Sequence, residues 1–180
     1  LVALLTQEGE LGQAAAILEP ARSAHPNHPQ VLARMGTLAY RRGQAREAVV
    51  HLQRAAELAP DDRSIAGALA QAQQASEDTA GAIATLNDWL ARFPEDAGMH
   101  LLHANLLLEH GREQDAIAAY RAYLANGQEN VVALNNLAWL LRKTAPDEAL
   151  RLVERAAARA PESGEILDTQ GVIQLAAGDK

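Results

Sequence analysis

Small and apolar side chains recur along this chain at a step of 34 residues. The step separates Ala14, Ala48, Ala82 and Ala116, and the next equivalent residue, Ala149, follows after 33 residues. The same step separates Leu18, Leu52, Leu86 and Tyr120, the prolines Pro26, Pro60 and Pro94, and, with Glu77 at one place, the glycines Gly9, Gly43 and Gly111. Because several residue types keep one register, the chain is predicted to be an array of internal repeats.

Within each repeat, residues that start and end helices divide the pattern into two helices. Gly43 can supply the left-handed backbone that ends a first helix, and Pro60 ends a second one. Asp61, Asp62 or Ser64 can then accept hydrogen bonds from the N–H groups that begin the next helix. The pattern predicts eleven helical segments, at residues 1–8, 11–24, 29–42, 45–58, 63–76, 79–92, 97–110, 113–125, 131–143, 146–159 and 164–177.

A unit of 34 residues with these landmarks resembles the tetratricopeptide repeat, and the resemblance covers the whole chain. It implies an all-α, right-handed superhelical solenoid of antiparallel helix pairs, with a concave face lined mainly by the first helix of each pair. Each pair buries its apolar stripe against the next, so the expected core is a continuous seam. We expect a single array over residues 1–180, made of a partial repeat 1–28, repeats 29–62, 63–96, 97–130 and 131–163, and a partial repeat 164–180. Both chain ends fall inside a repeat, which predicts a segment of a longer array.

Two positions carry expectations about packing. Gly36 and Ala55 are expected to be small because helices of neighbouring hairpins approach closely there. In the third copy Trp89 stands where a small residue is usual. Either the indole fills room left by Ala66 and Ala70, or the pitch of the superhelix changes locally; overpacking alone would cost roughly 1–3 kcal/mol, which favours the first interpretation.

Composition and charge exclude several classes of function. The 180 residues are 48% hydrophobic and about a fifth alanine, with a formal net charge of −7. An acidic chain argues against nucleic-acid binding, which needs excess Lys and Arg to neutralise phosphates. No apolar run approaches the roughly 20 residues that a membrane-spanning helix needs, so this segment is not expected to insert into a membrane. Without cysteine, disulfides, thiolate catalysis and Cys-ligated metals are excluded.

Candidate metal and catalytic residues are few. His100, His103 and His110 share one stripe of a predicted helix and could ligate Zn²⁺ or Ni²⁺, but the repeat register places the first two between packed helices. Packing is therefore the preferred interpretation, with no metal and no cofactor predicted. His25 and His28 are interpreted as residues of the turn between repeats. No phosphate-binding loop or GxSxG motif is present, and the paired acids at repeat junctions are interpreted as helix caps, so no enzymatic activity is predicted.

The surface predicted to carry function is the groove formed by the first helices. Asn105 and Asn136 offer donors and acceptors for the backbone of an extended peptide, and Trp139 offers an apolar anchor. Arg34, Arg41 and Arg142 could meet carboxylates of the partner. The alternative is a solvated face without a ligand. The residues predicted to face inward are Arg34, Thr37, Arg41, Gln71, Gln74, Leu101, Asn105, Leu108, Asn135, Asn136, Trp139, Arg142, Asp168 and Val172.

One family-specific site can be compared directly. In chaperone-binding tetratricopeptide domains, Lys, Asn and Arg side chains of three repeats clamp a C-terminal carboxylate. The resemblance places Asn105 and Asn136 at the two asparagines of that clamp. Leu101, Glu165 and Thr169 stand where its cations should be, so a receptor for chaperone tails is not expected.

The predicted function is a protein–protein interaction scaffold that binds a peptide or helix of a partner in its concave groove. An alternative is a structural spacer or assembly module of a bacterial envelope export or exopolysaccharide system. Residues 135–141, 146–149 and 167–171 are similar to tetratricopeptide lipoproteins linked to exopolysaccharide and PEP-CTERM sorting systems. On that resemblance a periplasmic or envelope-associated location is slightly favoured over a cytoplasmic one. End-to-end self-association is also possible, because array ends can stack.

Overall fold

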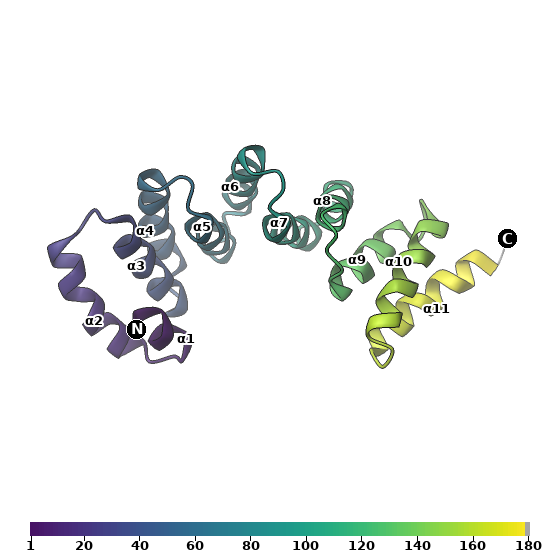
Figure 1. Ribbon diagram of the computed structural model, residues 1–180, viewed down its shortest axis with the longest axis horizontal. Helices are drawn as coiled ribbons and strands as arrows, with labels where there is room; N and C mark the ends of the chain where they lie inside the picture. The colour runs from purple at the N-terminus through teal and green to yellow at the C-terminus, as the bar shows by residue number, and fades with distance from the viewer. Residues whose placement is uncertain (179–180) are drawn as a thin grey trace. The chain divides into compact units, whose positions relative to one another are not determined.

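The computed structural model describes residues 1–178 and shows eleven helices and no strand over that range (Figure 1). Every predicted helix is present, with ends within two residues of those predicted, which confirms the all-α fold. The end of the last predicted partial repeat, residues 179–180, lies outside the described residues. The helices are α1 (Val2–Gln7), α2 (Leu11–Ala24), α3 (Pro29–Arg41), α4 (Ala45–Leu58), α5 (Arg63–Ala75), α6 (Thr79–Arg92), α7 (Ala97–Glu109), α8 (Glu113–Ala125), α9 (Val131–Leu141), α10 (Pro146–Arg159) and α11 (Gly164–Gly178).

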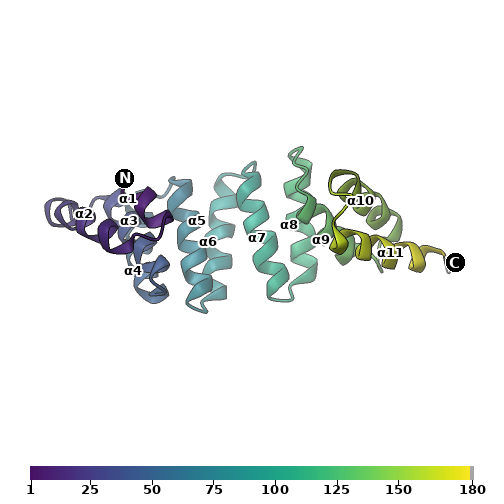
Figure 2. The same cartoon turned by 90° about the horizontal axis from the view of Figure 1, so that it is seen from below.

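The chain folds into two compact units, Leu1–Arg92 with α1 to α6 and the part from Phe93 onward with α7 to α11. Within each unit, consecutive helices pack side by side (Figure 2). First helices also contact one another within the units, α3 with α1 and α5, and α9 with α11. The repeat boundaries and the single array stay predictions. No helix in residues 1–178 combines the length and the apolar character needed to cross a membrane.

The alanines that define the repeat are fully buried in both units. Ala14, Ala48, Ala82, Ala116 and Ala149 are each 0% exposed. Large side chains at the neighbouring repeat position are buried too, with Leu52 at 1%, and Leu86 and Tyr120 at 0%. A methyl group suffices where helices approach closely, so the periodic alanines allow each unit to exclude water with few aromatic residues.

Gly36 is tightly packed, but against a different helix from the one expected. A Cβ at this position would lie 2.5 Å from Leu52 Cγ and 3.1 Å from the carbonyl oxygen of Ala48. Both residues belong to α4, the second helix of the same hairpin. The expectation of a close approach between neighbouring hairpins was therefore wrong for Gly36, because the small residue serves the α3–α4 pair itself.

The caps of the first helices follow the repeat. Asp62 accepts hydrogen bonds from the backbone of Ser64 at 2.9 Å and Ile65 at 3.2 Å, Asp96 from Met99 at 3.1 Å, and Asn130 from Ala133 at 3.0 Å. Such caps satisfy N–H groups that have no partner within the helix. Asp61, the other predicted cap, has a different role.

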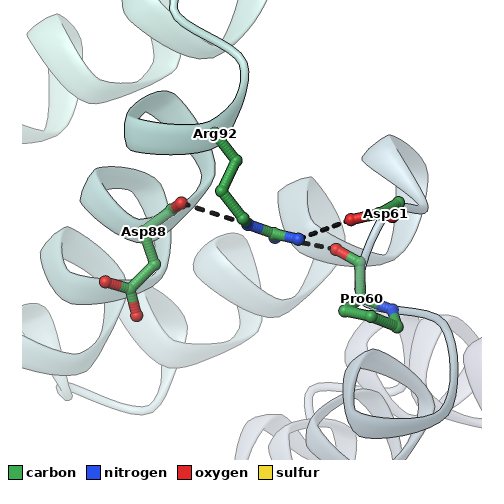
Figure 3. A network of polar contacts seen from close by, with 4 residues as sticks. All are labelled: Pro60, Asp61, Asp88 and Arg92. Carbon is green, nitrogen blue, oxygen red and sulfur yellow. Dashed lines mark hydrogen bonds and ion pairs between the residues drawn. The ribbon is translucent and has the colours of Figure 1, made fainter.

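Arg92, at the end of α6, bonds to Pro60 and Asp61 in the turn between α4 and α5 (Figure 3). Its guanidinium donates to Asp61 Oδ1 at 2.5 Å and to the Pro60 carbonyl oxygen at 2.8 Å, and its Nε donates to the Asp88 carbonyl oxygen at 3.3 Å. The same guanidinium lies 5.6 Å from the ring centre of Trp89, which is only 3% exposed. The buried indole agrees with the interpretation that Trp89 fills space. The arginine holds the α4–α5 turn against the end of α6.

The turn between the two helices of a hairpin requires a left-handed residue. Gly9, Gly43 and Gly111 have φ of +84°, +75° and +70°, and Glu77 adopts +68° at the equivalent position of the third copy. A side chain in this conformation costs roughly 1–2 kcal/mol relative to glycine. Part of that cost is offset because glycine has more freedom in the unfolded chain.

Replacing Glu77 by glycine is therefore expected to raise the free energy of unfolding by about 0.5–1 kcal/mol, since it removes the left-handed strain. The measurement is a urea unfolding curve followed by circular dichroism at 222 nm. The matched control is Gly111→Ala, which introduces the same strain into the α7–α8 turn and should lower stability by a similar amount. A Glu77→Gly chain less stable than the parent would contradict the strain argument.

Candidate functional site

The second unit carries the predicted groove asparagines on its first helices. Asn105 lies on α7 and Asn136 on α9, and both are half-buried. Their side chains are not paired directly. Each forms a hydrogen bond to the hydroxyl of Tyr120, which comes from the second helix α8 between them.

Tyr120 fixes the orientation of both amides. Its hydroxyl donates to Asn105 Oδ1 at 2.7 Å and accepts from Asn136 Nδ2 at 3.0 Å. Burial raises the pKa of the Tyr120 phenol, against a smaller opposite effect of the bond from Asn136, so the donating hydrogen is retained. Since the hydroxyl has one hydrogen, one bond must be donated and the other accepted. Asn105 is left with an amino donor and Asn136 with an oxygen acceptor.

The sequence pattern did not indicate Tyr120 as part of this site. The residue was assigned only to the repeat position that is leucine in Leu18, Leu52 and Leu86. The sequence did offer one signal for this role, a tyrosine hydroxyl at a position that is leucine in these three copies. Tyr120 is 0% exposed, so its hydroxyl cannot bond to water and needs a partner in the protein, which the two asparagines provide.

Trp139 lies near the end of α9 and is 42% exposed. The Arg142 guanidinium lies 3.9 Å from the centre of the indole ring, and its Nη1 donates to the Trp139 carbonyl oxygen at 2.6 Å. This cation–π contact packs the guanidinium against one face of the indole. Val132, 58% exposed, precedes Asn136 and Trp139 by four and seven residues, so the three side chains form one stripe along α9. Val132 was missed, although the periodicity contained it.

The remaining predicted residues of the second unit are placed differently. Asn135 is only 4% exposed, with its Nδ2 donating to Glu165 Oε1 at 3.4 Å and its Oδ1 buried without a partner. Thr169 is buried, and its hydroxyl donates to the Glu165 backbone oxygen. The Glu165 carboxylate at this place would repel a carboxylate ligand, which supports the expectation that the chaperone-tail clamp is missing. Leu101 and Leu108 are half-buried, and Asp168 and Val172 are exposed.

In the first unit, the predicted residues lie on α3 and α5. Arg34 and Arg41 are exposed on α3, and the half-buried Thr37 donates its hydroxyl to the Ala33 carbonyl oxygen at 2.9 Å. On α5, Gln71 is exposed and Gln74 is half-buried. The structure brings together Asn105 with Asn136, through Tyr120, and Trp139 with Arg142, in the second unit.

The histidines of α7 serve packing. The His100 ring is 2.8 Å from the Pro94 carbonyl oxygen, and His103 is half-buried with its Nε2 lacking a partner. Burial lowers the pKa of His103, and the charges of His100 and Arg112 act in the same direction. Over residues 1–178, no three His, Cys, Asp or Glu side chains are grouped so that they could hold a metal ion.

Comparison with known proteins gives one family and several similar folds. A family model described as tetratricopeptide repeat matches residues 5–72 and 39–106. No protein with a curated function matches the sequence. The solved structures include MamA, at 18% identity over 90% of this chain and 95% of that chain, with a TM-score of 0.77. PilF of Pseudomonas aeruginosa has 20% identity over 95% of this chain and 78% of its own, with a TM-score of 0.77. YrrB, described as a TPR protein with an unusual peptide-binding site, has 16% identity over 94% of this chain and 88% of its own, with a TM-score of 0.74.

Proposed function

Because this chain belongs to the tetratricopeptide repeat family, we propose that it binds a peptide or helix of a partner protein along α7 and α9. Tetratricopeptide repeat proteins are generally non-enzymatic scaffolds for protein–protein interaction, and a non-catalytic role is proposed for this chain. The contact surface is defined here as Asn105, Val132, Asn136, Trp139 and Arg142, and is called the α7–α9 surface.

The observation that carries this proposal is the hydroxyl of Tyr120 between the two asparagines. It leaves a donor on Asn105 and an acceptor on Asn136, the complement of a peptide backbone, which offers both C=O and N–H in every residue. Groups held in place before binding lose less entropy when a ligand arrives. The amides of Asn105 and Asn136 are therefore suited to bind a peptide main chain, whatever side chains the peptide carries.

Trp139 supplies the apolar contact. Exposed indoles that become buried dominate the energy of many interfaces, and Arg142 packs against one face of this indole. Arg142 itself is positioned to meet an acidic side chain beside the anchor. Support from comparison is limited to YrrB, a protein of similar fold with a described peptide-binding site.

The test is capture of partners from a bacterial lysate by the immobilised chain. Asn136→Ala combined with Trp139→Ala is expected to abolish capture, because it removes the acceptor and the apolar anchor together. The control is Arg151→Ala with Glu154→Ala, two exposed residues of α10 outside the α7–α9 surface. Both variants should keep the helicity of the parent by circular dichroism. Undiminished capture by the first variant would refute the α7–α9 surface as the binding site.

The other expectations of the sequence remain proposals. The net charge of −7 makes nucleic acid an improbable ligand, and end-to-end association of array ends stays a prediction. The envelope-assembly role and the periplasmic location rest on the resemblance of residues 135–141, 146–149 and 167–171 alone.

A further inference from the structure

A pocket of about 470 Å³ opens at the junction of α2 and α3 in the first unit. Its volume is within the range of small-ligand sites in proteins. Leu18 and Val31 give it apolar walls, and its rim carries nitrogen-bearing side chains. The lining residues are Leu18, His25, His28, Gln30, Val31 and Arg34.

The equivalent junction one repeat later is closed. There Ile65 is 0% exposed, and Ala59 and Ala68 pack against the core cluster that contains it. In the α2–α3 junction the corresponding residues are Val31, His25 and Arg34. Val31 is one methylene shorter than Ile65 and remains half-buried, and the place of Ala68 is taken by Arg34, whose side chain is charged and exposed. The apolar wall of the pocket therefore lacks a methylene that the closed junction has, and its rim gains a cation.

Pro20 is a second difference between the two junctions. It lies inside α2, where α4 has Arg54 at the equivalent position. A proline in a helix interior removes one backbone hydrogen bond and bends the helix away from its axis. The last turn of α2, which leads to His25, follows this proline directly.

The rim is built to attract an anion. Arg34 forms no ion pair or hydrogen bond in the described part of the chain, and α3 contains no acidic residue. His28 Nδ1 accepts a hydrogen bond from the Gln30 backbone at 3.2 Å, so a neutral ring carries its hydrogen on Nε2 and is a donor there.

The acids beside the lining residues are already engaged. Asp62 accepts from Gln30 Nε2 at 2.6 Å and from the start of α5, and these hydrogen bonds lower its pKa. Glu19 is paired with Arg22. A carboxylate of the ligand would therefore not have to displace another carboxylate from the Arg34 guanidinium.

We propose that this pocket, called the α2–α3 pocket, binds a large apolar side chain of a partner segment whose next residue is acidic. The apolar side chain replaces the contacts that Ile65 and Ala68 make at the closed junction, and the carboxylate pairs with Arg34. That the partner is a protein rests on the proposed function. The lining residues of the pocket belong to the first unit, whereas Asn136 and Trp139 belong to the second.

The experiment uses the dipeptide probe Ac-Leu-Glu-NH2, titrated into the ¹⁵N-labelled chain and followed by amide chemical shifts. We expect saturable shifts at Leu18, Val31 and Arg34, with affinity in the roughly millimolar range. Ac-Leu-Gln-NH2 and Ac-Ala-Glu-NH2 should each bind more weakly, because the first lacks the charge and the second the anchor. Since the probe makes no use of the α7–α9 surface, this result can fail while capture through Trp139 succeeds, or the reverse.

Two variants identify the pocket as the site. Arg34→Gln should weaken Ac-Leu-Glu-NH2 by about three- to tenfold and leave Ac-Leu-Gln-NH2 unchanged, since one exposed charge pair is lost. Val31→Ile adds the methylene that the closed junction has, and should weaken binding of Ac-Leu-Glu-NH2 and Ac-Leu-Gln-NH2 alike. The control, Arg46→Gln, removes an exposed arginine of α4 and should change nothing. The proposal is overturned if the three probes give equal shifts, or if dilution of the protein alone moves the same amides, because a second copy would then occupy the pocket.

Discussion

Replacing Tyr120 by alanine is expected to lower the free energy of unfolding by about 3–5 kcal/mol, the usual cost of deleting a fully buried aromatic ring. Tyr120 is 0% exposed and lies between α7 and α9, so no solvent can fill the space left by the ring. Tyr120→Phe is expected to cost about 1–2 kcal/mol, because Asn105 Oδ1 and Asn136 Nδ2 lose a partner while half-buried. Urea unfolding followed at 222 nm measures both differences.

The same helix supplies a matched control. Tyr123 is buried on α8 at 7% exposure, and its hydroxyl has no hydrogen-bond partner within residues 1–178. Tyr123→Phe should therefore change stability by less than about 0.5 kcal/mol, since it leaves no donor or acceptor unpaired. Equal losses in Tyr120→Phe and Tyr123→Phe would show that the bridge to the asparagines contributes nothing.

The helices could be predicted closely because their ends depend on local chemistry. A cap such as Asp62 bonds to residues two and three places along the chain, and a turn such as that at Gly43 requires a positive φ of a single residue. The 34-residue repeat adds to this local information, because a helix end with a weak signal in one copy can be placed from a copy in which the signal is strong. Glu77 shows the strength of this register: the backbone takes the left-handed conformation although the residue is not glycine.

The site could be predicted only in part, because it depends on where side chains from different helices meet. The sequence indicated Asn105 and Asn136 as binding residues but not the Tyr120 hydroxyl that orients them, which arrives from a third helix. It grouped Asn135 with its neighbour, although the two side chains differ in burial. A stripe with a helical period cannot separate adjacent positions at its edge, so the degree of burial requires the structure.

The α2–α3 pocket was missed for a related reason. His25 and His28 were interpreted as turn residues, which they are, and their chemistry was set aside with that assignment. The opening depends on Val31 in place of Ile65, and the charge of the rim on Arg34 in place of Ala68. A search for what the repeats share does not detect such differences between copies. In a repeat protein, departures from the pattern are the places where a ligand can find unfilled volume.

Replacing Gly36 by alanine is expected to lower the free energy of unfolding by about 1–3 kcal/mol, as overpacking does in closed cores. The new methyl would lie 2.5 Å from Leu52 Cγ, and Leu52 is 1% exposed and has no room to move aside. The free-energy cost of this clash exceeds the roughly 1 kcal/mol that alanine gains over glycine in helix propensity. Thermal and urea unfolding of the variant measure the balance.

Gly171 provides the opposite case at the equivalent position of the last repeat. It lies within α11, and a Cβ there would meet no atom within 4 Å. Gly171→Ala is therefore expected to raise stability by about 0.5–1 kcal/mol, because only the propensity remains. Stability changes of opposite sign at two glycines of the same repeat position would show that Gly36 is required by the facing Leu52 and not by the backbone of the first helix. If Gly36→Ala were as stabilising as Gly171→Ala, α3 and α4 would have to lie farther apart than the structure places them.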